Sequence, residues 1–101
     1  MATLFLDELR CITTEDNFGS DHAYITVNDE RVWGPERINN GDSLDIGVQR
    51  AFDGQIKVEL WDQDDLDPDD RLGSHVVRPG DGGTLNFAND GSDYRMLYRV
   101  G

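Results

Sequence analysis

Six carboxylates fall within nine consecutive residues, 62–70, and no basic side chain separates them. The six are Asp62, Asp64, Asp65, Asp67, Asp69 and Asp70. Carboxylates held about 5–7 Å apart repel one another by about 1 kcal/mol per pair when they are well solvated at a protein surface, and several-fold more when they are partly buried. A cation bound among them would turn this repulsion into binding energy. The segment therefore indicates a site for a hard, oxygen-binding cation, and the alternative is a solvated acidic loop that only keeps the protein in solution.

Calcium suits this segment better than the other common metal ions. Ca²⁺ accepts about 6–8 oxygen ligands in a flexible geometry, whereas Mg²⁺ requires a strict octahedron and retains its waters. Zn²⁺ favours Cys and His, and His22 and His75 are the only histidines. An EF-hand loop fits poorly, because the segment lacks the Gly that such a loop needs at its sixth position. Asp62 and Asp64 are two residues apart at a strand end, so their side chains point the same way.

A second acidic segment, 13–21, lies between the first two predicted strands and contains Glu15, Asp16 and Asp21. Connections in a β-sandwich cluster at its two ends. We therefore expect this segment and the segment 62–70 to share one end and to face each other. A third segment, 49–54, is expected to lie at the same end of the sandwich if the strands run in the order predicted below.

The elements that would position these loops are strands, because the dominant hydrophobic period is two. Apolar and polar residues alternate in five main stretches, at 4–11, 23–27, 44–48, 55–61 and 94–100, with shorter candidates at 72–77 and 85–87. The apolar phase slips between Leu6 and Leu9, which predicts a β-bulge near Asp7 and Glu8. Asn28-Asp29 predicts a hairpin, and no segment has a helical period. The predicted fold is all-β, an antiparallel sandwich of seven to eight strands.

The length and charge of the chain limit what it can do. Its 101 residues fit a single domain, 1–101, with a small core. The 21 acids and 9 bases give a net charge of -12, which argues against nucleic acid, because phosphate binding needs a positive face. The single cysteine, Cys11, excludes an internal disulfide and lies in an apolar stretch, where we expect it to be buried.

The sequence shows neither a membrane span nor a secretory signal. No apolar run approaches the roughly 20 residues that a transmembrane helix needs. The N-terminal eight residues lack the basic start and long apolar stretch of a secretory signal. We expect a protein of the cytoplasm, a protein exported by a non-classical route, or an excised domain.

The sequence does not favour an enzyme. His22 and His75 lie near opposite ends of different predicted strands, so a catalytic triad is not indicated. A pair of carboxylates could serve glycoside hydrolysis, but that chemistry needs a substrate cleft that so small a domain is not expected to build.

Two segments carry a family resemblance. Segment 20–27 reads SDHAYITV, and segment 58–64 reads VELWDQD and is followed by DRLG at 70–73. They are similar to the Ser-Asp-Pro-Tyr-Val-x-Val and Val-x-Val-Tyr/Trp-Asp-x-Asp…Asp-x-Ile/Leu-Gly signatures of C-two (C2) domains. These are the calcium- and phospholipid-binding β-sandwiches of synaptotagmins and protein kinase C. The resemblance spans most of the chain in order and implies a C-two-like Greek-key fold.

The resemblance also implies a ligand set for calcium between the two acidic loops. The matched positions are Asp21, Asp62, Asp64 and Asp70, with Asp67 as an outer-site ligand and the backbone carbonyl of Gln63 as a further donor. The ligand from the first loop falls on either Glu15 or Asp16. The Lys-rich concave strand of the family is missing here, so the resemblance does not extend to phosphoinositide binding.

Phe18 and Leu66 are isolated apolar residues in the middle of the two acidic loops. In the C-two family, apolar loop tips enter lipid once calcium has neutralised the acids; the alternative is that each side chain folds back onto the sandwich. The resemblance thus implies a calcium-binding module that contacts a phospholipid membrane or a protein partner. The alternative function is a structural or protein-interaction domain in which calcium only stabilises the fold or the site is empty.

Overall fold

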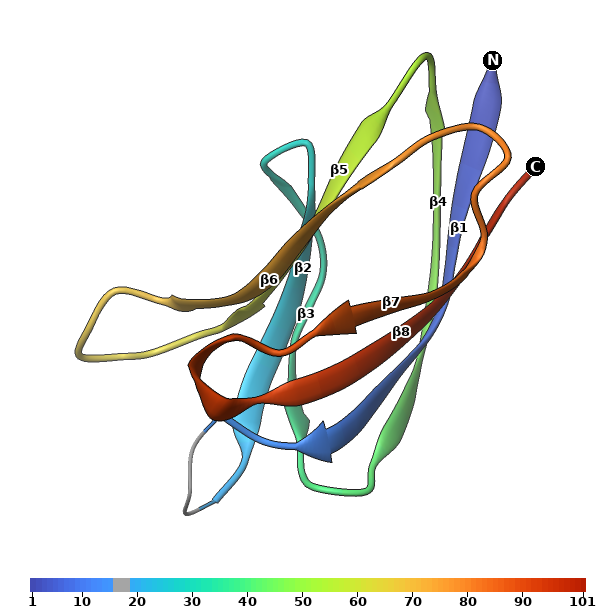
Figure 1. Cartoon of the computed structure of the whole chain (residues 1–101). Coiled ribbons are helices and arrows are strands. Elements are labelled where there is room, and N and C mark those ends of the chain that lie inside the picture. The colour runs from blue at the N-terminus through green and yellow to red at the C-terminus, as the bar shows by residue number, and fades with distance from the viewer. Residues whose placement is uncertain (16–18) are drawn as a thin grey trace.

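The computed structural model of the chain describes residues 1–15 and 19–101 and arranges them as a β-sandwich (Figure 1). Eight strands in these residues form two four-stranded antiparallel sheets, ordered β4-β1-β8-β7 and β3-β2-β5-β6. The strands are β1 (Ala2–Thr13), β2 (Asp21–Val27), β3 (Glu30–Ile38), β4 (Ser43–Phe52), β5 (Ile56–Asp62), β6 (Asp70–Val77), β7 (Gly83–Phe87) and β8 (Asp93–Val100). The predicted all-β sandwich of seven to eight strands is confirmed.

The core lies between the sheets and is built from the apolar faces of the alternating strands. Val58 and Leu60 of β5 and Tyr94 and Met96 of β8 are fully buried. Cys11 is 2% exposed within the same core, as predicted. Burial of one face of each strand explains why the period of two in the sequence is so clear.

Two local irregularities occur where the sequence predicts them. The register of β1 shifts between Leu6 and Glu8 against both of its neighbours, so a bulge lets Leu6 and Leu9 both face the core. At the β2–β3 hairpin, Asn28 and Asp29 have φ angles of 48° and 70°. Asn and Asp tolerate this left-handed region better than most residues, and two such residues in a row suit a tight hairpin.

The topology brings four strand ends together. β1 ends at Thr13, β2 begins at Asp21, β5 ends at Asp62 and β6 begins at Asp70. Antiparallel pairing of β5 with both neighbours places Ala23 of β2 and Asp70 of β6 opposite Asp62. The two acidic loops therefore share one end of the sandwich, as expected.

Segment 49–54 lies at the other end, so the expectation that it joins the acidic loops is wrong. β4 runs antiparallel to β1 and begins at Ser43, opposite Arg10, whereas its last residue, Phe52, pairs with the start of β1. The β4–β5 turn therefore lies near the chain termini (Figure 1). The β3–β4 turn, residues 39–42, takes its place beside the acidic loops.

The helical content of the described residues is one short 3₁₀ turn, η1 (Asn89–Gly91), between β7 and β8. Phe87 pairs with Tyr94, and Tyr94 pairs with Cys11 near the end of β1, so this turn also lies at the end with the acidic loops. Within residues 1–15 and 19–101, no helix has the length and apolar character needed to cross a membrane.

Candidate metal centre

Three acidic side chains meet where the two loops face each other. Glu15, Asp21 and Asp62 each offer a carboxylate oxygen, and these oxygens lie within 4.8 Å of one another. Asp21 is fully buried at the start of β2, Asp62 is 5% exposed at the end of β5, and Glu15 is half-buried. Asp70 opens β6 opposite Asp62. Carboxylates from distant parts of the sequence thus converge on one point.

Hydrogen-bond donors orient the two buried carboxylates. Asp21 Oδ2 accepts a hydrogen bond from the Glu15 N–H at 2.8 Å and another from the Tyr94 hydroxyl at 2.5 Å. Asp62 Oδ1 accepts one from the His22 N–H at 2.9 Å. Burial raises the pKa of Tyr94, so its hydroxyl remains a donor at neutral pH. The protein itself therefore sets the direction in which both carboxylates point.

The spacing and chemistry of the cluster fit a calcium ion. Calcium–oxygen distances of about 2.3–2.6 Å hold any two ligand oxygens within about 5 Å of each other. The oxygens of Glu15, Asp21 and Asp62 meet this limit. At an effective dielectric constant of about 20, charges about 5 Å apart repel by about 3 kcal/mol per pair, and a divalent cation among them would relieve this repulsion.

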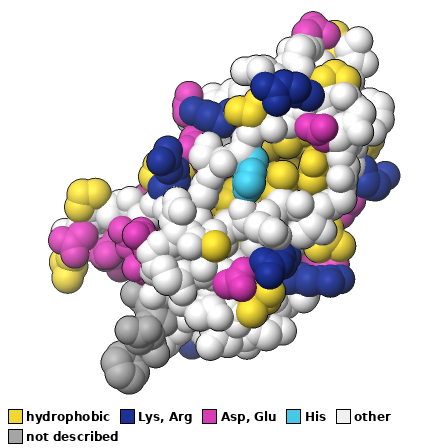
Figure 2. All heavy atoms as spheres, in the orientation of Figure 1, with side chains coloured by type: hydrophobic (Ala, Val, Ile, Leu, Met, Phe, Trp, Pro, Cys, Tyr) yellow, Lys and Arg dark blue, Asp and Glu magenta, His cyan; other side chains and the backbone are white. Residues whose placement is uncertain are grey.

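The remainder of the acidic segment 62–70 forms the β5–β6 loop, which projects from the body of the sandwich (Figure 1). Figure 2 shows acidic side chains gathered on this loop beside hydrophobic ones at its tip. Asp64 and Asp67 are exposed and do not belong to the three-carboxylate cluster. Asp64 Oδ1 accepts hydrogen bonds from the Leu66 N–H at 3.1 Å and the Asp67 N–H at 3.4 Å, so it caps its own loop. The metal roles of Asp64, Asp67 and the Gln63 carbonyl stay predictions.

Of the two predicted apolar loop tips, Leu66 and Phe18, the structure describes only Leu66. Leu66 is 94% exposed, so it does not fold back onto the sandwich. Phe18 and Asp16 lie outside the described residues, so the tip role of Phe18 stays a prediction. The choice between Glu15 and Asp16 as the first-loop ligand also stays a prediction, although Glu15 is in the cluster.

Residues of the β3–β4 turn form hydrogen bonds with both ends of the first acidic loop. The Asn40 side-chain oxygen accepts a hydrogen bond from the N–H of buried Thr14 at 2.7 Å. At the other end of the loop, the Ser20 hydroxyl forms a hydrogen bond with the Asn39 side chain and accepts a second hydrogen bond, at 2.8 Å, from Nε of Arg37 on β3. In the sequence, Asn39 and Asn40 are recognised only as part of a turn, and no local feature predicts their contact with the loop.

A further contact fastens the projecting loop to the outer face of its sheet. The Asp69 carboxylate accepts hydrogen bonds from the Tyr24 hydroxyl at 2.5 Å and the Asp64 N–H at 3.0 Å. The Tyr24 ring stacks on Trp61, and the Arg31 guanidinium lies 4.1 Å from the centroid of the Tyr24 ring. The hydrogen bond from Tyr24 lowers the pKa of Asp69, while burial and that same bond raise the pKa of Tyr24 to about 12. From the sequence, Asp69 is only one of six acidic residues in the segment 62–70, and no separate role for it is predicted.

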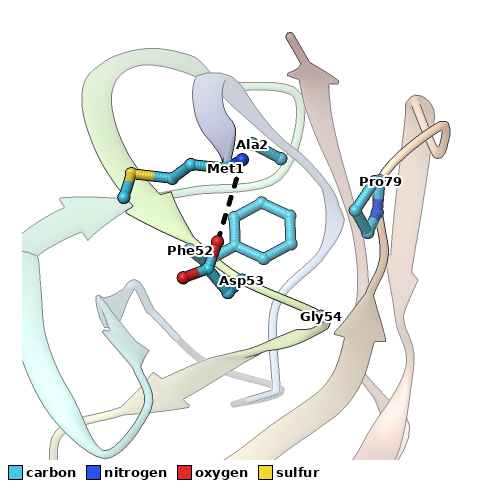
Figure 3. A pocket seen from close by; sticks show the side chains of 6 residues that line it. All are labelled: Met1, Ala2, Phe52, Asp53, Gly54 and Pro79. Carbon is cyan, nitrogen blue, oxygen red and sulfur yellow. Dashed lines mark ion pairs between the residues drawn. The ribbon is translucent and has the colours of Figure 1, made fainter.

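A pocket at the opposite end of the sandwich has different chemistry. Its volume is about 180 Å³, and it is lined by Met1, Ala2, Phe52, Asp53, Gly54 and Pro79 (Figure 3). Asp53 Oδ1 lies 3.8 Å from the terminal amine of Met1. With a single carboxylate among these lining residues, the pocket does not have the donor set of a calcium site.

Comparison with known proteins identifies the class of fold. No family model and no curated protein matches the sequence. A solved structure described as that of a C2 domain aligns over 99% of this chain and 96% of its own, with a TM-score of 0.58 and 17% identity. Human GIVD cytosolic phospholipase A2 in complex with methyl gamma-linolenyl fluorophosphonate aligns over 98% of this chain and 16% of its own (TM-score 0.54, 12% identity). The same enzyme with that inhibitor and terbium chloride gives a TM-score of 0.52 at 14% identity, over 96% of this chain and 17% of its own. The chain therefore has the β-sandwich fold of C2 domains.

Proposed function

We propose that this protein is a non-catalytic calcium-binding module whose bound calcium promotes contact with a phospholipid membrane. The observation that carries the proposal is the convergence of Glu15, Asp21 and Asp62 within 4.8 Å. The C2-type fold supports it, because the cluster joins the two loops that resemble the calcium loops of that family. The other predicted donors are Asp70, Asp64, Asp67 and the Gln63 carbonyl.

Calcium fits this donor set better than magnesium or zinc. The three converging groups are carboxylates on two separate loops, which suits a large ion with flexible coordination. The His22 side chain is exposed and is not part of the cluster, so the set lacks the nitrogen or sulfur donors that zinc favours. When bound, calcium would supply positive charge at this end and open coordination positions for lipid phosphate oxygens.

Charge neutralisation alone does not bring this end to an anionic bilayer. The two loops contain nine carboxylates, so even two bound calcium ions leave them negative. Phosphate coordination and apolar insertion must therefore supply the binding energy. The 94% exposure of Leu66 supports its proposed insertion into the bilayer. Full burial of one such side chain contributes about 1.5–3 kcal/mol, short of the roughly 4 kcal/mol that corresponds to a millimolar Kd.

We expect weak, calcium-dependent co-sedimentation of the protein with vesicles of phosphatidylserine and phosphatidylcholine. Leu66→Ala should weaken this binding roughly 30-fold, because it removes about 2 kcal/mol of apolar burial in the bilayer. Its calcium affinity in solution should not change. Val76→Ala is the matched control, since Val76 is 43% exposed on β6 and pairs with Lys57, away from the loops.

Two outcomes would count against the membrane proposal. If calcium-loaded protein stays in the supernatant with anionic vesicles, the ion has a structural role or serves a protein partner. If Leu66→Ala binds vesicles as tightly as the unmodified protein, this loop tip does not insert.

A further inference from the structure

A tyrosine of the core reaches the candidate metal centre from the opposite sheet. Tyr94 lies on β8, in the sheet that does not contain Asp21, and its side chain is fully buried. Its hydroxyl donates a hydrogen bond to Asp21 Oδ2 at 2.5 Å. The two residues are 73 positions apart in the chain, so only the packing of one sheet on the other brings them together.

This contact fixes a carboxylate that has little other freedom. Asp21 is fully buried, and its Oδ2 atom also accepts the hydrogen bond from the Glu15 N–H at 2.8 Å. Two donors, one from the core and one from the first acidic loop, therefore converge on the same oxygen. The arrangement sets the plane of the Asp21 carboxylate and ties the backbone of Glu15, a second member of the cluster, to it.

We infer that Tyr94 is a positioning residue for the calcium site, holding Asp21 and through it Glu15 in the orientation that an ion requires. The inference rests on the proposed function, because it presumes that Asp21 is a calcium ligand. Hydrogen bonds from outer-shell groups to metal ligands orient those ligands, and their removal costs about 10–100-fold in metal affinity. The ring of Tyr94 belongs to the core, while its hydroxyl belongs to the site.

The test is a calcium titration of Tyr94→Phe, which retains the ring in the core and removes only the hydroxyl. We expect the Kd for calcium to rise about 10–100-fold. The matched control is Tyr98→Phe, four residues along the same strand. Tyr98 is also buried, and it pairs with Leu6 of β1 and Gly83 of β7, away from the acidic cluster. Tyr98→Phe should lower the melting temperature without changing the Kd.

Hydrogen exchange in chelator gives a second readout that does not depend on bound calcium. Loss of the Tyr94 hydroxyl should loosen the Asp21 carboxylate, and the Glu15 amide that donates to it should exchange faster. The Glu15 amide of Tyr98→Phe should exchange at the rate of the unmodified protein.

The outcomes separate this inference from the proposed function. If the unmodified protein binds calcium and Tyr94→Phe binds it within twofold as tightly, with unchanged exchange at Glu15, Tyr94 is only a core residue and the inference is overturned. An equal rise in Kd for both tyrosine variants would also overturn it, because the effect would then come from general destabilisation. If the unmodified protein does not bind calcium, both the proposed function and this inference fail.

Discussion

Saturating calcium is expected to raise the melting temperature of this protein by about 10–20 °C. A ligand that binds only the folded state at a hundredfold excess over its Kd stabilises that state by about 2.7 kcal/mol. For a domain of this size, each kcal/mol corresponds to about 4–8 °C. Relief of the repulsion among Glu15, Asp21 and Asp62 is part of the binding free energy that sets this Kd.

Thermal unfolding followed by circular dichroism in chelator, in calcium and in magnesium measures this effect. Magnesium at the same concentration should shift the melting temperature far less, since it requires a stricter geometry and gives up its waters reluctantly. A melting temperature that stays the same from chelator to millimolar calcium would mean that the acidic end is only a solvated surface.

Asp62→Asn is expected to weaken calcium binding by about 100-fold or more. The substitution removes the charge of a buried member of the cluster, and a loss of about 3 kcal/mol of attraction corresponds to a change of this size. Asparagine retains an oxygen that can accept the hydrogen bond from the His22 N–H. The metal-free fold should therefore stay intact or become slightly more stable, because one repulsive charge is gone.

The matched control is Asp65→Asn, which removes the same charge from an exposed position in the same loop. It should change the calcium Kd only a few-fold, because charges exposed to solvent are screened. Equal losses from Asp62→Asn and Asp65→Asn would show that diffuse loop charge, and not the three-carboxylate cluster, holds the ion.

Features of the fold that depend on neighbouring residues could be predicted from the sequence. The alternation in β5 and β8 identifies their buried faces, and the phase slip after Leu6 locates the bulge in β1. These signals are local, because one buried face imposes a period of two on each strand. The shared end of the two acidic loops also follows, since Asp21 begins one strand and Asp62 ends its neighbour.

Features that depend on how the sheets are assembled could not be predicted. The predicted position of segment 49–54 is wrong, because no local feature of the sequence indicates the direction of β4 relative to β1. Glu59 faces away from the core and is nevertheless 4% exposed, because it lies between Lys57 on its own strand and Arg71 on β6. The Tyr94 hydroxyl likewise reaches Asp21 only through the packing of the two sheets.

A calorimetric titration of the metal-free protein with calcium, and in parallel with magnesium, tests most directly whether the cluster of Glu15, Asp21 and Asp62 binds calcium. We expect saturable heat with calcium at a stoichiometry of at least one ion per chain, and a Kd at least tenfold lower than for magnesium. The expected selectivity follows from oxygen ligands carried on two separate loops, which suit the flexible coordination of calcium. Absence of saturable calcium heat up to millimolar concentration, or equal affinity for the two ions, would contradict a calcium site at this end of the sandwich.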